Sequence, residues 1–410
     1  MAAQAETSAG LRQEYVPRPP AERRGKALCL SGGGFRAALF HLGAVRRLNE
    51  LGVLSQLDVI SSVSGGSILA AHLARWVDPW PARGTIYRDW DASVARRFRD
   101  FCSRNLRTWP LLQRYLLPWN WLRRGAEVDA FASAYVRRLT PASLLELPSQ
   151  PAFIFCATDL VFGVNWRYSR ASVGDYMAGS CTPPSSLLVA RAVAASSCFP
   201  PVFPPTRTLL AAKQLSGGRF PAGPERERLI AGLRLTDGGV YDNMGLEPVW
   251  KTGETVLVSD GGAVFPFRIA TTLVRLLKRY ADIGANQAAA VRKRWLISNF
   301  LAKILTGAYW GIGSSTSSFP VAGVPGYSDP LVKECIAPIR TDMDAFTEAE
   351  MRVLENHGYS VAEAAIRSHA PALIGSNADA FRPPHPDWLD ESRVRNALGN
   401  SSRRYLLGRF

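Results

Sequence analysis

The chain has 410 residues, of which 47% are hydrophobic and 20% charged, a composition that excludes a disordered or fibrous protein. Its 49 Lys and Arg residues outnumber 34 Asp and Glu, and this net charge of +15 favours an anionic partner such as a membrane face. No nucleic-acid-binding module accompanies the charge, so we expect no nucleic-acid partner. No apolar run reaches the roughly 18 uninterrupted residues of a membrane span.

The N-terminus and the cysteines indicate the compartment. The first twenty residues lack the basic and apolar regions of a signal peptide, and we interpret residues 1–25 as a flexible leader. The six cysteines are scattered, without CxxC pairs or metal-like spacing to histidine. We therefore expect free thiols, no metal site and a cytoplasmic location.

In chain order, the first elements are two strand-turn-helix units. Residues 26–31 read as a buried strand, the three glycines 32–34 as a turn and 36–50 as a helix. A second strand, 57–63, precedes a second helix, 66–76. Two such units predict a mainly parallel α/β sheet. Further strands are expected at 152–160, 233–239 and 255–262.

The glycine loop lies in "SGGGFRA", residues 31–37. It also satisfies the G-x-G-x-x-[GA] pattern of a dinucleotide site, but the next strand ends in Ser62–Gly66 instead of the acidic residue that such a site needs. We therefore favour an anion or oxyanion cradle formed by the N–H groups of Gly33 and Gly34. The alternative is a tight turn that needs positive φ.

A candidate nucleophile follows the second strand in "SVSGG", residues 62–66. This is a near match to G-x-S-x-G, a strained turn that exposes a serine hydroxyl at the mouth of a helix. Ser62 replaces the first glycine, and Ser64 is the candidate. The alternative is that Ser64 only caps the helix.

A base for Ser64 is expected downstream. The downstream histidines lie near helix ends or between prolines, so we expect structural roles for His357, His369 and His385. Asp237 directly follows a strand and precedes two glycines, and Asp260 has the same local pattern. The residue pattern alone does not separate the two aspartates.

Two segments suit contact with a lipid surface. Residues 75–124 hold six tryptophans and eleven arginines against four aspartates. The signal is strongest in "PWNWLRR" (118–124), where tryptophan and arginine lie close together. A helical subdomain with buried tryptophans explains them equally well. Residues 268–283 predict a helix with Arg275, Arg279 and Asp282 opposite an apolar stripe of Ile269, Leu273, Leu276, Leu277, Tyr280 and Ile283. Such stripes usually pack in a core, so we expect packing there, with interfacial binding as the alternative.

Near the C-terminus, "TEAE" (347–350) and "SVAE" (360–363) each match a capping box and predict a helix start. Residues 376–410 are polar and basic, and we expect a loosely docked tail.

Taken together, the motifs resemble those of the patatin-like phospholipases, which are related to the cytosolic phospholipases A. The resembling stretches occur in the family's order over roughly residues 26–262: "SGGGFRA" (31–37), "SVSGGS" (62–67), "ATDL" (157–160), "AVAASSCFPPVFPP" (192–205) and "DGGVYDNMGLEP" (237–248). The resemblance implies a three-layer α/β fold in a domain of residues 26–375, with a helical Trp/Arg-rich insertion at 77–130.

The resemblance also implies roles for individual residues. Ser64 takes the place of the nucleophile and Asp237 that of the base, because Asn243 and Pro248 follow Asp237 as in the family's pattern. The oxyanion loop falls on Gly32, Gly33 and Gly34. Arg36 takes the place of a basic residue that either steadies the loop or meets a lipid phosphate.

The activity implied is hydrolysis of fatty-acyl esters of phospholipids or lysophospholipids, without a metal or organic cofactor. The partner implied is the phospholipid, with peripheral contact to an anionic membrane surface. The alternatives are a hydrolase of neutral lipids or small esters, and a non-catalytic module that binds an anion or lipid.

Overall fold

The computed structural model describes residues 22–108, 126–200, 203–262, 265, 269, 271–405 and 408–409. Most of the expected leader and the whole of "PWNWLRR" lie outside these residues.

The centre of the molecule is a ten-stranded sheet, ordered β10-β9-β1-β2-β3-β4-β5-β6, with β8 pairing with β3 and β7. Its strands are β1 Lys26–Leu30, β2 Val59–Val63, β3 Ala152–Asp159, β4 Val164–Tyr168, β5 Val173–Asp175, β6 Gly179–Cys181, β7 Thr206–Arg207, β8 Arg234–Asp237, β9 Thr255–Asp260 and β10 Thr306–Gly311. The five strands from β10 to β3 are parallel, and the rest pair antiparallel. The parallel half confirms the predicted α/β class.

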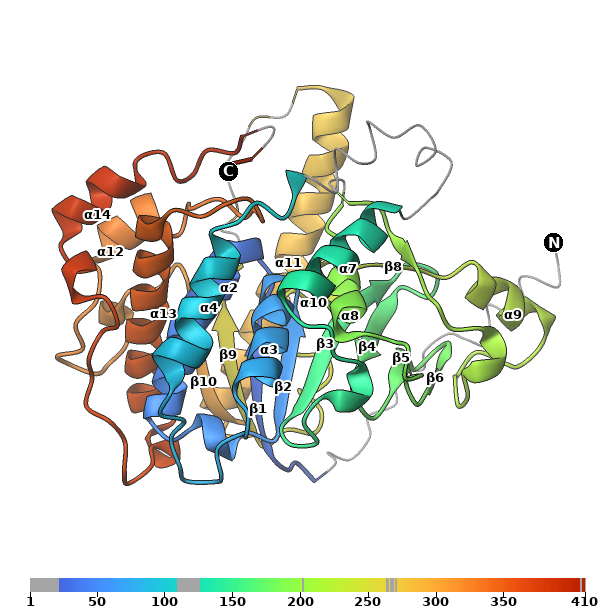
Figure 1. Cartoon of the computed structure of the whole chain (residues 1–410), viewed down its shortest axis with the longest axis horizontal. Helices are drawn as coiled ribbons and strands as arrows, with labels where there is room; N and C mark the ends of the chain where they lie inside the picture. Colours follow the sequence, from blue (N-terminus) through green and yellow to red (C-terminus); the bar gives the residue numbers. More distant parts are fainter. Residues whose placement is uncertain are drawn as a thin grey trace.

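Helices cover both faces of the parallel half (Figure 1). They are α2 Gly34–Glu50, α3 Gly65–Trp76, α4 Arg96–Cys102, α7 Ala126–Arg138, α8 Val189–Ser196, α9 Pro224–Ala231, α10 Gly239–Asp242, α11 Leu273–Leu301, α12 Asp329–Leu331, α13 Glu348–His369 and α14 Glu391–Leu398. Alternation along β1 separates two cores, since successive side chains of a strand point to opposite faces. Leu28 and Leu30 join the core that holds α2 and α3, whereas Ala27 and Cys29 join the core that holds Leu296 of α11. The fold therefore has three layers.

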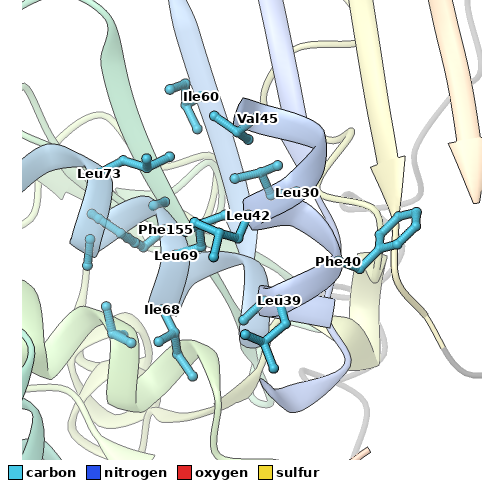
Figure 2. Close-up of a cluster of buried hydrophobic side chains, with 14 of the residues drawn as sticks. Leu30, Leu39, Phe40, Leu42, Val45, Ile60, Ile68, Leu69, Leu73 and Phe155 are labelled. Atoms are coloured by element: carbon cyan, nitrogen blue, oxygen red, sulfur yellow. The ribbon is translucent and has the colours of Figure 1, made fainter. Parts of the chain in front are cut away.

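The larger core lies between α2, α3 and the sheet. Figure 2 shows Leu42 of α2 and Leu69 of α3 beside Phe155 of β3. Phe40 points to another side of α2, where its ring lies 5.5 Å from that of His357 in α13. Burial of these apolar side chains is the main force that holds the helices on the sheet.

Helices α2 and α13 cross at very short range. A Cβ placed on Gly43 of α2 would lie 1.8 Å from the carbonyl oxygen of Glu355, and one on Gly358 of α13 would lie 1.8 Å from that of Phe40. Real Cβ atoms do not approach backbone oxygens so closely, so the crossing requires glycine at both positions.

One of the two predicted capping boxes is wrong. Thr347 caps α13, and its Oγ accepts a hydrogen bond from the Glu350 N–H. Ser360, by contrast, lies inside the same helix, where the Glu363 carboxylate pairs with Arg47 of α2 at 2.8 Å. The two four-residue patterns are alike, and only the fold distinguishes the helix start at Thr347 from the helix interior at Ser360.

The C-terminal segment is not loosely docked as expected. His385 donates its backbone N–H to Asn356, and Arg340 donates its N–H to the carbonyl of Ser401. Arg409 contacts the buried Glu350 at 2.9 Å. These contacts join residues 376–410 to α13 and to the loop before it.

The described tryptophans of the Trp/Arg-rich segment pack inward. Trp90 is buried, and the ring of Trp80 meets that of Phe153 edge-on at 5.7 Å. Trp76 lies under the guanidinium groups of Arg75 and Arg97. For these three tryptophans the structure supports the packed subdomain over a lipid-facing surface.

Helix α11 corrects the expectation of core packing. Along its first half, from Leu273 to Ile283, the described side chains include none that is buried, and the apolar stripe is exposed except for the half-buried Leu276. Among the described residues, no helix combines the length and hydropathy needed to cross a bilayer.

Candidate active site

The ends of two strands meet beside β3. Val63, the last residue of β2, pairs with Cys156, and Asp237, the last residue of β8, pairs with Ala157. Strand β4 occupies the other edge of β3 at this level, so β2 and β8 share one edge. Because β2 runs parallel and β8 antiparallel to β3, they approach head to head. The register therefore brings Ser64, which follows Val63, to Asp237.

Ser64 occupies a strained turn between β2 and α3. Its φ of 50° and ψ of −116° lie outside the regions that residues with a side chain normally adopt. The glycines that follow allow the turn: a Cβ on Gly65 would lie 2.1 Å from the carbonyl oxygen of Gly34, and one on Gly66 would lie 2.2 Å from that of Leu30. The predicted nucleophile elbow is present in geometry.

Three further serines hold this turn in place. Ser196 of α8 accepts the backbone N–H of Ser64 at 2.9 Å, and its hydroxyl lies 2.9 Å from that of Ser67. Ser67 donates to Ser62, which in turn donates to the carbonyl of Ile154 at 3.0 Å. Ser62 thus fits the place of the usual first glycine because its hydroxyl has a buried acceptor.

The glycine loop lies directly against the serine. A Cβ on Gly32 would lie 3.1 Å from the Cβ of Ser64. Gly33 and Gly34 have φ of 144° and 60°, a region that favours glycine. Their N–H groups have no backbone acceptor within the described part of the chain, whereas the N–H of Gly32 donates to the carbonyl of Asn243 at 3.0 Å. Gly33 and Gly34 therefore present N–H donors, and Gly32 allows the loop to lie close to Ser64.

A carbonyl from a distant loop fixes the far side of the glycine turn. The N–H of Phe35 donates to the Asp342 carbonyl at 2.9 Å, and a Cβ on Gly34 would lie 2.6 Å from the same oxygen. Arg107 holds the Asp342 carboxylate at 2.6 Å. This loop is therefore part of the framework of the site.

Arg36 is buried and faces backbone carbonyls. Its guanidinium donates to the carbonyls of Ala337 and Ile339 at 2.9 and 3.0 Å, and to that of Gly261 at 2.9 Å. Burial lowers the pKa of Arg36 to about 10, so it stays charged at neutral pH. Of the two roles considered for Arg36, the contacts support steadying the loop and leave no exposed cation for a lipid phosphate.

Asp237 is buried beside Ser64. Burial raises the pKa of its carboxyl to about 7, although the Gly239 N–H and the Ser64 hydroxyl favour the ionised form. The Gly239 N–H donates to Oδ1 at 2.7 Å, while Oδ2 makes no well-aligned hydrogen bond within the described structure. This carboxylate is basic enough to accept a proton near neutral pH and keeps an oxygen available for it.

Asp260 has a different environment. Its Oδ2 accepts a hydrogen bond from the Tyr309 hydroxyl at 2.7 Å and lies 3.1 Å from Nζ of Lys293. Burial raises the pKa of this carboxyl, but Lys293 and Tyr309 outweigh burial and leave the pKa below its usual range. The Asp260 carboxylate therefore has a hydroxyl and an ammonium as partners, whereas Oδ2 of Asp237 has no well-aligned hydrogen-bond partner within the described structure.

The downstream histidines have partners elsewhere. Nε2 of His357 lies 2.8 Å from the carbonyl oxygen of Ile312, and that of His385 lies 2.8 Å from the Glu355 carboxylate. The ring of His369 lies 6.0 Å from that of Phe319, tilted by 60°. These contacts fit the structural roles expected for them.

Three contributors to the site were not assigned from the sequence. Ser196 and Asn243 fall within stretches that the family shares, so their motifs were visible but not their contacts. Asp342 acts through its backbone carbonyl, for which a sequence carries no signal. Only the folded chain shows that these residues surround the serine turn.

The parallel sheet, its two helical layers and a strained serine at the end of a parallel strand define a three-layer α/β protein of the kind that holds a nucleophile elbow. A family model described as "Patatin-like phospholipase" matches residues 28–250, more than half of the chain. The chain belongs to the patatin-like phospholipase family.

Two further comparisons are consistent with this assignment. A patatin-like phospholipase domain-containing protein of Aspergillus niger is 35% identical over 103 residues, which cover 25% of this chain and 12% of that protein. The human GIVD cytosolic phospholipase A2 superposes with a TM-score of 0.51 at 14% identity, covering 92% of this chain and 63% of the human chain. At that identity the human structure shows a shared fold.

Proposed function

We propose that the protein is a serine acyl hydrolase that cleaves fatty-acyl esters of phospholipids or lysophospholipids. Ser64 is the nucleophile and Asp237 the base in this proposal. The observation that carries it is the placement of a strained serine next to a buried carboxylate with a pKa of about 7 and an uncommitted oxygen. A group with that pKa is well matched to proton transfer at neutral pH.

In the first half of the reaction, Oγ of Ser64 attacks the ester carbonyl carbon while Asp237 takes the hydroxyl proton. The N–H groups of Gly33 and Gly34 donate to the oxyanion that forms. Collapse breaks the ester C–O bond, Asp237 returns the proton to the leaving alcohol, and the acyl group stays on Ser64.

In the second half, water attacks the acyl-serine and gives its proton to Asp237. The second oxyanion uses the same donors, and its collapse releases the fatty acid as Ser64 recovers its proton. The cycle balances without a metal or an organic cofactor. The backbone donors are held in advance by Asp342 and Arg36, so little reorganisation is needed during the reaction.

Family membership and the charge of the chain both support a phospholipid substrate. A net charge of +15 favours approach to anionic membranes, so we propose a cytoplasmic enzyme with peripheral membrane contact. The hydrolase domain is proposed to span 26–375, with the insertion at 77–130, and the segment 376–410 packs onto it.

The test is fatty-acid release from anionic phospholipid vesicles by the wild type and by Ser64→Ala, matched for unfolding temperature. Release that falls to background in the variant supports the proposal. Equal release by both proteins would show that Ser64 is not the nucleophile. Faster cleavage of dispersed neutral lipid or short-chain esters than of vesicles would favour the alternative substrate class, and no cleavage of any ester would favour a binding module.

A further inference from the structure

The first half of α11 exposes a row of large apolar side chains. The exposed fractions are 72% for Leu273, 59% for Leu277, 66% for Tyr280 and 44% for Ile283. These residues recur at helical spacing along one side. Among the side chains of this helix that the structure describes, the first buried one is Leu296. An apolar stripe of this size facing water carries a cost in free energy unless another surface covers it.

The topology places this stripe beyond the carboxyl ends of the parallel strands, which is where Ser64 lies. Helix α11 connects the parallel strands β9 and β10, so it begins at the carboxyl ends of the strands and returns to their amino ends. Its 29 residues are about 43 Å long, whereas a six-residue strand spans roughly 20 Å. The helix must therefore project past the sheet, and Figure 1 shows its first half standing clear of the body.

The second half of α11 is anchored next to the proposed base. Arg292 donates to the Tyr241 carbonyl and lies 3.4 Å from the Asp242 carboxylate, both in α10. Helix α10 begins two residues after Asp237. Trp295 meets Trp250 edge-on at 4.9 Å. The projecting half is thus held in a fixed relation to the site.

The charges along the stripe are mostly positive. Between 273 and 283 the chain has one acidic residue, Asp282, against three basic ones: Arg275, Lys278 and Arg279. Lys278 pairs with Asp282 at 2.7 Å, which neutralises the acid within the helix. Apolar side chains flanked by cations match a surface of anionic headgroups over acyl chains.

We propose that residues 273–283 form a docking helix that inserts its apolar side into an anionic phospholipid surface. The helix would hold the carboxyl ends of the parallel strands, where Ser64 lies, against that surface. The inference rests on the proposed function for its substrate but concerns binding. A second copy of the chain is a poorer occupant, because two such helices in contact would bring like charges such as Arg275 and Arg279 together.

The test is flotation with phosphatidylcholine vesicles, with or without phosphatidylglycerol. The protein carries Ser64→Ala, so that binding is measured without hydrolysis. We expect binding to the anionic vesicles, weakened at least about tenfold by Leu273→Ser with Leu277→Ser. Leu301→Ser is the matched control, since Leu301 is 80% exposed at the opposite end of the same helix, and its binding is expected to stay at the parent level.

A second pair of substitutions tests whether the cations of the helix attract the anionic headgroups. Arg275→Gln with Lys278→Gln is expected to weaken binding to anionic vesicles and to flatten its dependence on salt. Unfolding temperatures check folding, and the single change Leu277→Gln replaces the double leucine variant if that variant is unstable.

Three outcomes would overturn the proposal: no binding by the parent protein, equal binding by the leucine variant, or a parent dimer in light scattering that the leucine variant makes monomeric without any vesicle binding. Failure of the proposed function can be told apart from failure of the docking proposal. Covalent labelling of Ser64 by a serine-reactive fluorophosphonate tests the wild-type active site without vesicles.

Discussion

The Tyr309 hydroxyl donates a hydrogen bond to Oδ2 of Asp260 at 2.7 Å. Asp260 is the last residue of a strand and precedes two glycines, as Asp237 does, so the two residues look alike in sequence. The structure gives Asp260 a hydroxyl and a lysine as partners, whereas Asp237 faces Ser64. The two carboxylates therefore have different surroundings, and exchanging each for an amide should separate their roles.

We expect Asp237→Asn to lower turnover by about a hundredfold to ten-thousandfold, because the amide cannot take the Ser64 proton. Asp260→Asn is expected to retain most of the activity and to lose about 1–3 kcal/mol of stability, since Tyr309 and Lys293 lose a charged acceptor. Ester hydrolysis together with urea unfolding of both variants measures the contrast. The reverse pattern would assign the base to Asp260.

The pH dependence follows from the raised pKa of Asp237. The base must be ionised to work, so turnover should rise with pH and level off above about pH 7. A profile that levels off near pH 4, the ordinary range of an aspartate, would contradict burial as the cause.

The same pKa affects stability with the opposite sign. An aspartate whose pKa is higher in the folded than in the unfolded state stabilises the fold when protonated, and this contribution is lost as pH rises from about 4 to about 7. The loss is at most roughly 4 kcal/mol. We expect Asp237→Asn to raise the unfolding temperature at pH 8 more than at pH 5. An equal change at both pH values would show that the ionised carboxylate carries no cost.

The glycine loop provides a third test. Gly34→Ala adds a Cβ that would lie 2.6 Å from the Asp342 carbonyl at a φ of 60°, so the donors should shift. Loss of one oxyanion donor typically lowers turnover a hundredfold to a thousandfold. Gly84→Ala is the control, because Gly84 also has positive φ, at 82°, but has open space around it. Similar turnover of both variants would show that the glycine loop does not stabilise the oxyanion.

The crossing of α2 and α13 is a test of the fold alone. Gly43→Ala is expected to cost about 1–3 kcal/mol, because the new methyl group overlaps the Glu355 carbonyl. Gly284→Ala, in the exposed half of α11 with nothing within 4 Å, should instead stabilise by up to about 1 kcal/mol. Urea unfolding measures both, and a harmless Gly43→Ala would mean that the helices lie further apart.

Local patterns were sufficient to predict four of the five parallel strands, β1, β2, β3 and β9. Strands β1, β2 and β9 are short apolar runs that end in glycine turns, which is the pattern of buried parallel strands. The antiparallel strands β5, β6 and β7 were missed because they have only 3, 3 and 2 residues, and β4 because Asn165 and Arg167 interrupt its apolar run. Strand β10 contains Gly307 and Gly311, which weaken the strand pattern.

Contacts between distant segments were beyond the reach of the sequence. The hydrogen bond from Phe35 to Asp342 joins residues about three hundred positions apart through backbone atoms, which leave no compositional trace. The stripe on α11 was recognised, but whether it faced a core or solvent depended on the length of the helix relative to the strands beside it.

The most direct test of the Ser64–Asp237 pair is the covalent labelling of the protein by a serine-reactive fluorophosphonate, with the adduct located by peptide mass spectrometry. We expect the adduct on Ser64, formed at a rate that falls sharply in Asp237→Asn and is nearly unchanged in Asp260→Asn. An adduct on another serine, or labelling of Ser64 that is indifferent to Asp237→Asn, would contradict the proposed pair.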